Sequence, residues 1–199
     1  MNYLAHIFLS GDHLDRQLGG FLGDFVKGPL DGESLQAWRE CWPDELFQGI
    51  RLHRRLDAFV DAWSPYQECV ELLGADYRRW GGVAMDVFFD HLLARHWGRY
   101  SDVYLPDYSA AFYQWCEQRQ ELMPERARQF IARARVNDLW VGYGDVNIFL
   151  PVLERIDQRV RFETNLVETG EQVLSHYCEL ETRFLALLPE LLRKSEAWC

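Results

Sequence analysis

The segment from Val83 to Trp97 places two carboxylates and an imidazole inside an almost wholly apolar stretch. On a helix with 3.6 residues per turn, Asp86 and Asp90 lie about 40° apart and one turn from each other, and His91 lies about 100° further round. Large apolar residues fill most of the other positions, so we expect this helix to be central and buried. Buried charges are costly unless they are paired, hydrogen-bonded or bound to a metal. This conflict is the main indication of function.

Composition and pattern favour one all-α domain over residues 1–199. The chain has 199 residues, of which 48% are hydrophobic and 15% aromatic, enough to bury a substantial core. Alternating β-branched runs are absent, which favours helices over strands. No apolar run approaches about 18 residues, so a membrane-spanning helix is not expected. The N-terminus lacks the basic region of a signal peptide.

Turn-forming residues divide the chain into the helices that we expect. Their predicted ranges are 3–9, 12–27, 35–42, 44–63, 64–74, 77–100, 106–122, 124–140, 145–162 and 168–193. Glycines at 19, 20 and 23 indicate either a kink in the second helix or another element that approaches it closely. The pair Gly81-Gly82 favours a break just before the central segment.

Cysteine usage and charge exclude several classes of protein. Five scattered cysteines without C-x-x-C spacing argue against a disulfide framework or a zinc ribbon and fit a reducing cytoplasm. The net charge of −10 disfavours general nucleic-acid binding. Of the 21 basic residues, only Lys27 and Lys194 are not arginine. Because arginine binds carboxylates and phosphates through two hydrogen bonds, a local patch could still dock an acidic or phosphorylated partner.

Three further polar positions stand out. His53, Asp57 and Asp61 are spaced by four residues and therefore lie along one stripe of a helix. A histidine and an aspartate one turn apart can ligate a metal, or act as a ligand and the residue that orients it; ordinary Arg–Asp pairs on an exposed helix are the alternative. Asp24 stands among glycines and large apolar residues, in a segment that does not match the phosphate-binding loop pattern. His6 lies on an apolar helix, where a histidine is more often a core residue.

Together these positions form a set of nitrogen and oxygen ligands on four helices. The candidate metal ligands are Asp24, His53, Asp57, Asp86, Asp90, His91 and His6. Without a thiolate, such a set favours Mn²⁺, Mg²⁺ or Fe²⁺ over structural zinc. A metal in such a site polarises a phosphoryl oxygen and activates water. The candidate catalytic residues are Asp24, His53, Asp57, Asp86 and Asp90.

Four blocks of sequence, in this order, carry a resemblance to a known family. They are Met-Asn-Tyr-Leu-Ala-His6, Gly-Gly-Phe-Leu-Gly-Asp24-Phe-Val-Lys-Gly28, the block from Gly49 to Asp61, and the block from Asp86 to Trp97. Together they resemble the acyl carrier protein phosphodiesterase family, also called acyl carrier protein hydrolase. The blocks cover roughly the first half of the chain, and its overall length also agrees.

The resemblance implies a divergent, permuted HD-type helical bundle that uses a divalent metal, with Mn²⁺ preferred. It implies hydrolysis of the phosphodiester that joins 4′-phosphopantetheine to a serine of holo acyl carrier protein. The family's polar positions fall on the candidate ligands above, and which of them touch the metal stays open. The adjacent Asp90 and His91 are reminiscent of the HD dyad in reversed order.

Because acyl carrier proteins are acidic, the resemblance also implies a local basic docking patch. The leading candidates are Arg51, Arg54, Arg55, Arg78 and Arg79, and a second group comprises Arg126, Arg128, Arg133 and Arg135. Solvated helix faces paired with glutamates are the alternative for the second group.

Two other functions stay open at this point. The same site could hydrolyse a small nucleotide or phosphate ester, or the chain could be a non-catalytic helical binding module whose His–Asp pairs serve only structure. We expect no nucleic-acid partner and no membrane insertion, and the oligomeric state is left open.

Overall fold

The computed structural model describes residues 2–198, except the side chain of Ser34, and within this range the chain is helical without a β-strand. The α-helices are α1 (Tyr3–Leu9), α2 (Leu14–Leu22), α3 (Glu33–Cys41), α4 (Asp44–Ala62), α5 (Ser64–Leu72), α6 (Arg78–Arg95), α7 (Leu105–Gln118), α8 (Glu125–Val136), α9 (Leu139–Gly142), α10 (Phe149–Asp157), α11 (Leu166–Ser175) and α12 (Tyr177–Trp198). Four short 3₁₀ turns connect them: η1 (Ala75–Tyr77), η2 (Trp97–Arg99), η3 (Gln120–Leu122) and η4 (Val146–Ile148). The all-α prediction is confirmed.

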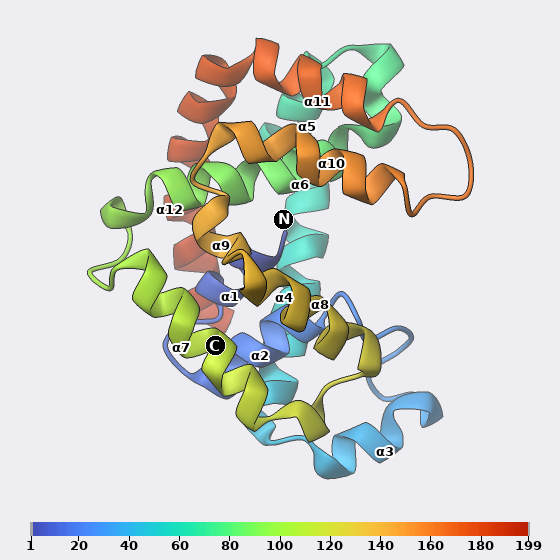
Figure 1. Ribbon diagram of the computed structural model, residues 1–199, viewed down its shortest axis with the longest axis vertical. Coiled ribbons are helices and arrows are strands. Elements are labelled where there is room, and N and C mark those ends of the chain that lie inside the picture. The colour runs from blue at the N-terminus through green and yellow to red at the C-terminus, as the bar shows by residue number, and fades with distance from the viewer. Residues whose placement is uncertain (1, 199) are drawn as a thin grey trace.

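Helix α6 is the central element of the fold, as its sequence predicts. It lies between α10 and α11 on one side and α1 on the other (Figure 1). Met85, Phe88, Leu92 and Leu93 on this helix are completely buried. Helix α12 contacts α1, α4, α5, α6 and α11 and so connects the two sides. No helix among residues 2–198 is long and apolar enough to cross a membrane.

The glycines of α2 bring two other helices into backbone contact. A Cβ atom at Gly19 would lie 2.0 Å from the carbonyl oxygen of Leu46 on α4, and one at Gly20 would lie 2.7 Å from the carbonyl oxygen of His6 on α1. Only glycine leaves room for such approaches. Of the two explanations that the sequence allows for these glycines, close approach of another element is confirmed. As a result α1 and α4 meet across α2.

Several predicted helix boundaries are wrong. The second helix begins at Leu14, after His13 at its N-cap, and ends at Leu22 instead of continuing to residue 27. The glycine pair 81–82 does not break α6, which runs continuously from Arg78 to Arg95. Gly81 instead leaves room for Val70 on α5, since a Cβ there would lie 2.8 Å from Cγ1 of Val70. The segments predicted at 124–140 and 168–193 each contain two helices.

We expect Gly49→Ala to destabilise the protein. The new Cβ would lie 2.1 Å from the carbonyl oxygen of Arg16, on the backbone of α2, which cannot move aside as a side chain could. Overpacking of this kind costs about 1–3 kcal/mol. Gly82→Ala is the matched control, because it lies within α6 with nothing within 4 Å of the new Cβ, and alanine favours a helix by about 1 kcal/mol. Urea unfolding measures both, and a Gly49→Ala protein as stable as wild type would contradict the packing.

Candidate metal centre

Helices α1 and α4 bring two imidazoles and a carboxylate together in the interior. One ligand atom from each of His6, His53 and Asp57 lies within 4.8 Å of the others. Both imidazoles are almost completely buried, whereas the Asp57 side chain is 40% exposed. The two rings lie against each other, tilted by 30°, with their centroids 3.8 Å apart. Among residues 2–198 this is the group of three or more His, Cys, Asp or Glu side chains that is arranged to hold a metal ion.

The hydrogen bonding of His53 leaves one ring nitrogen for a cation. Its Nδ1 lies 2.8 Å from the carbonyl oxygen of Gly20, and because a carbonyl only accepts, Nδ1 carries the proton and donates. In this tautomer the lone pair is on Nε2, which lies 3.1 Å from Oδ2 of Asp57 and 3.9 Å from Oδ1 of Asp24. This is the usual arrangement of a metal-ligating histidine. Gly23 makes room for the ring, since a Cβ there would lie 2.2 Å from Cγ of His53.

His6 and Asp57 are in the protonation states that a metal requires. Burial, reinforced by the neighbouring His53, lowers the pKa of His6 to about 4, so the ring is neutral at pH 7. Burial alone would raise the pKa of Asp57, but its interactions with His53 and His6 outweigh this and hold the pKa well below its ordinary range. The Nε2 atom of His6 lies 3.0 Å from Oδ1 of Asp57, yet neither ring nitrogen has a well-aligned hydrogen-bond partner among the described residues. A buried unpartnered nitrogen beside a carboxylate fits a bound cation.

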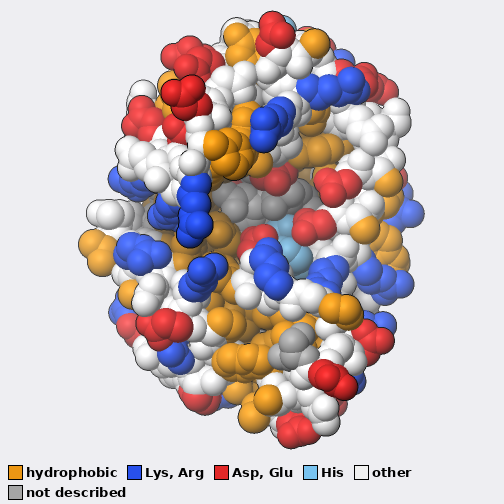
Figure 2. Space-filling model, turned by 90° about the vertical axis from the view of Figure 1, so that its right-hand side faces the viewer, with side chains coloured by type: hydrophobic (Ala, Val, Ile, Leu, Met, Phe, Trp, Pro, Cys, Tyr) orange, Lys and Arg blue, Asp and Glu red, His pale blue; other side chains and the backbone are white. Residues whose placement is uncertain are grey.

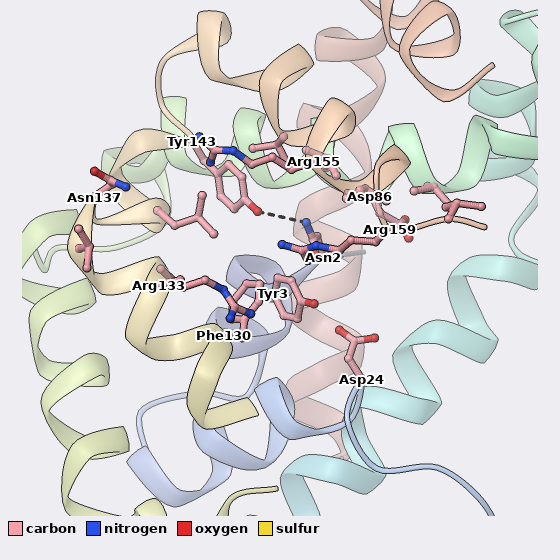
Figure 3. A pocket seen from close by; sticks show the side chains of 18 residues that line it. Asn2, Tyr3, Asp24, Asp86, Phe130, Arg133, Asn137, Tyr143, Arg155 and Arg159 are labelled. Atoms are coloured by element: carbon pink, nitrogen blue, oxygen red, sulfur yellow. Dashed lines mark hydrogen bonds between the residues drawn. The ribbon is translucent and has the colours of Figure 1, made fainter. Parts of the chain in front are cut away.

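Two more predicted carboxylates face a pocket of about 790 Å³ beside this group. Asp24 follows α2 and lies next to both His53 and the pocket (Figure 3). Burial raises the pKa of Asp24, the electrostatic interaction with His53 lowers it, and the charge of Asp57 raises it again. Asp86 lines the same pocket from α6 and accepts a hydrogen bond from the Tyr66 hydroxyl at 2.9 Å. One face of the molecule is hollowed, and acidic, basic and histidine side chains gather around the hollow (Figure 2).

The structure does not bring Asp90 into this group. Its carboxylate is completely buried and accepts hydrogen bonds from the backbone N–H groups of Leu4 at 2.8 Å and Ala5 at 3.0 Å. These amides belong to the first turn of α1, where a helix leaves its N–H groups without intrahelical partners. Asp90 therefore ties α1 to α6 and positions His6. Burial raises the pKa of Asp90 to about 7, although the two hydrogen bonds lower it.

His91 also lies outside the group, because both of its ring nitrogens already have partners. Its Nδ1 donates to the carbonyl oxygen of Tyr143 at 2.7 Å, and its Nε2 accepts from the Tyr177 hydroxyl at 2.8 Å. His91 lies about 140° round α6 from Asp86, so its ring points away from that carboxylate. Asp61, one turn beyond Asp57, is exposed and lies outside the group as well.

The predicted docking arginines are divided between internal contacts and the surface. Arg54 donates to the carbonyl oxygens of residues 26 and 28, at 3.0 and 2.8 Å, and so fixes the segment after α2. Arg78 pairs with a glutamate on α5 at 2.9 Å. Arg55 and Arg79 lie over aromatic rings, and Arg51 is exposed.

Sequence reasoning missed two arginines that line the pocket, Arg155 on α10 and Arg159 just after it. In the helix predicted at 145–162 their spacing of four places both on one face, whereas in the structure α10 ends at Asp157 and Arg159 lies in the turn that follows. That signal was present in the sequence, but nothing in the sequence placed α10 beside α6. Arg133, from the second predicted group, lines the same pocket.

Comparisons with known proteins agree with the resemblance. The family model described as acyl carrier protein phosphodiesterase matches residues 1–191. A Yersinia pestis protein named acyl carrier protein phosphodiesterase is 30% identical over 201 residues, which cover 98% of each chain. An Escherichia coli O157:H7 protein of the same name is 30% identical over 203 residues, which cover 98% of this chain and 97% of that protein. No solved structure matches.

We expect Asp57→Asn to weaken Mn²⁺ binding at least about tenfold, because it removes the charge of the one carboxylate in the group. Asp61→Asn is the matched control, since it removes the same charge one turn further along α4. Isothermal titration of metal-free protein with Mn²⁺ measures both affinities. Equal losses in the two variants, or no loss in either, would contradict the assignment.

The raised pKa of Asp90 predicts a pH-dependent stability. A folded-state pKa of about 7 lies above the ordinary value of 3.8, so the folded protein binds this proton more tightly than the unfolded chain. The resulting stabilisation is complete below pH about 4 and is lost as the pH rises through 7. Urea unfolding in the presence of a chelator should show that wild type gains stability over Asp90→Asn between pH 8 and pH 5. A difference that does not change with pH would contradict the assignment.

Proposed function

The chain belongs to the acyl carrier protein phosphodiesterase family, and from this premise we propose how its buried His–Asp group performs the reaction. The enzyme hydrolyses the phosphodiester between 4′-phosphopantetheine and a serine of holo acyl carrier protein, and the products are apo acyl carrier protein and 4′-phosphopantetheine. The observation that carries the proposal for the site is the convergence of His6, His53 and Asp57 within 4.8 Å.

These three residues hold a divalent metal in the proposal. Imidazole nitrogens and a carboxylate without a thiolate suit Mn²⁺, Mg²⁺ or Fe²⁺, and of these Mn²⁺ is the metal that the family resemblance implies. When bound, the metal polarises a phosphoryl oxygen and makes water a better nucleophile. The hydrogen bond from His53 to Gly20 fixes the ring so that Nε2 faces the site.

Asp24 is the proposed general base. It lies at the junction of the His–Asp group and the pocket, and its raised pKa suits a carboxyl group that accepts and returns a proton. Asp24 takes a proton from the attacking water, the phosphorus–oxygen bond to serine breaks, and the serine oxygen leaves with that proton. Asp86, held by the Tyr66 hydroxyl, orients the water from the other side of the pocket.

Three further features belong to the proposal. An HD-type origin of the fold is supported by His53 and Asp57 one turn apart on α4, with a second histidine supplied from α1. A single domain over residues 1–199 is supported by the packing of α1 on one side of α6 and of α10 and α11 on the other. A cytoplasmic location is supported by the four described cysteines, all free: Cys41, Cys69, Cys116 and Cys178. Cys199 lies outside the described residues.

Mass spectrometry of holo acyl carrier protein tests the function directly. With enzyme and Mn²⁺, the carrier protein should lose the mass of its phosphopantetheine arm. Asp24→Asn should lower kcat about 10²–10⁴-fold, because it removes the general base, with little change in the melting temperature. Asp61→Asn should keep near wild-type turnover.

Two outcomes would overturn the proposal. An unchanged carrier-protein mass after incubation with folded, metal-loaded enzyme would exclude the reaction. Faster hydrolysis of nucleotides or phosphate monoesters than of holo carrier protein would favour a small-molecule phosphohydrolase.

A further inference from the structure

Three arginines line the pocket beside the His–Asp group, and the mechanism proposed above assigns no role to them. Arg133 extends into the pocket from α8, Arg155 from α10 and Arg159 from the turn after α10 (Figure 3). None of the three makes a hydrogen bond, an ion pair or a ring contact with another described residue. Acidic residues outnumber basic ones by 31 to 21 in this chain, so intramolecular partners are plentiful. Three unpaired guanidinium groups around one pocket indicate an anionic ligand.

The rest of the pocket wall fits a ligand that is only partly charged. Apolar side chains from α6 and α10 form much of it: Val83, Val87, Val152 and Ile156. Two amide side chains, Asn2 and Asn137, also face the pocket. The volume of about 790 Å³ lies within the range of roughly 300–1,000 Å³ that is typical of small-molecule sites. A phosphate ester with a branched apolar segment and amide groups matches the arginines, the apolar side chains and the amide side chains of the pocket.

The arginines and the His–Asp group are electrostatically connected through Tyr3. Burial raises the pKa of Tyr3, the charge of Asp24 raises it further, and the charge of Arg159 lowers it. The Tyr3 hydroxyl is therefore within electrostatic reach of both side chains. The geometry agrees, because the Arg159 side chain lies beside Asn2 and near Asp86, in the pocket that Asp24 also lines (Figure 3). Asp24 in turn borders His53 at 3.9 Å, so Arg159 lies toward the end of the pocket where the phosphodiester would be cleaved.

We propose that this pocket binds the 4′-phosphopantetheine arm of the substrate, with its phosphate next to Arg159. Arg155, in the last turn of α10, adds a second positive charge to the same pocket. Arg133 and Asn137, across the pocket, bind the polar groups of the arm, and the valines contact its dimethyl segment. The inference rests on the proposed function, because that reaction detaches this arm and leaves its phosphate as a more highly charged product.

A concave site also distinguishes this role from docking of the carrier protein. Side chains that dock an acidic protein lie on an accessible convex or flat face, where Arg51 and Arg55 on α4 are exposed. The three pocket arginines instead surround a hollow that leads to Asp24 and Asp86. They are therefore expected to discriminate ligands by the arm and its phosphate, and not by the protein surface.

Isothermal titration of Mn²⁺-loaded enzyme tests the inference with three probes: 4′-phosphopantetheine, pantetheine and apo acyl carrier protein. Wild type should bind 4′-phosphopantetheine at least about tenfold more tightly than pantetheine, because charge-assisted hydrogen bonds to phosphate are strong. Arg155→Gln and Arg159→Gln should each lose about tenfold or more for 4′-phosphopantetheine, with little change for pantetheine or apo carrier protein. Arg135→Gln is the matched control, because Arg135 lies on α8 outside this pocket and pairs with Glu117.

Unchanged 4′-phosphopantetheine affinity in both pocket variants would overturn the inference. A loss confined to apo carrier protein would also overturn it and would assign the arginines to protein docking. Failure of the proposed function would give a different result, because the wild-type enzyme would then leave the mass of holo carrier protein unchanged. The titration still decides whether the pocket binds the arm in that case.

Discussion

The site depends on a buried carboxylate that holds the first turn of the first helix. Asp90 lies at the centre of the apolar core and accepts the backbone N–H groups of Leu4 and Ala5. Those amides would otherwise be unsatisfied in the interior, and each unsatisfied buried donor costs about 1–3 kcal/mol. The two hydrogen bonds thus offset the cost of burying the carboxylate and the cost of burying the amides. They also fix α1 against α6. His6, on the same helix as these amides, is thereby placed against the ring of His53.

Close backbone packing at glycines brings α1, α2 and α4 together, in addition to the contact that Asp90 makes between α1 and α6. Gly20 lets α1 approach α2, and Gly19 with Gly49 lets α2 approach α4. Gly23 then provides the space that the ring of His53 occupies. The glycines weaken α2 as an isolated helix, but they allow ligands from helices distant in sequence to meet. The stability of the fold and the geometry of the site therefore depend on the same contacts.

Much of the fold and part of the site could be predicted from the sequence. Apolar residues on almost every side identified α6 as the buried centre, and the four-residue spacing identified His53 and Asp57 as neighbours. Spacing could not separate Asp86, which faces the pocket, from Asp90 one turn later, because both fall on one side of a helix surrounded by protein. Tertiary packing decides which helix contacts each side of α6. It also decides where Arg159 lies. His6 was among the candidate ligands, although a lone histidine on an apolar helix carries little signal of its own, and the sequence did not show that α1 packs beside α4.

The central claim is that His6, His53 and Asp57 together hold the metal on which hydrolysis depends. Anomalous X-ray diffraction from crystals grown with Mn²⁺ tests it most directly, because the signal locates the ion independently of activity. The account predicts one strong peak at bonding distance from Nε2 of both histidines and from the Asp57 carboxylate. A peak elsewhere, for example between Asp86 and residues of α10, or no peak from protein that binds Mn²⁺ in solution, would contradict it.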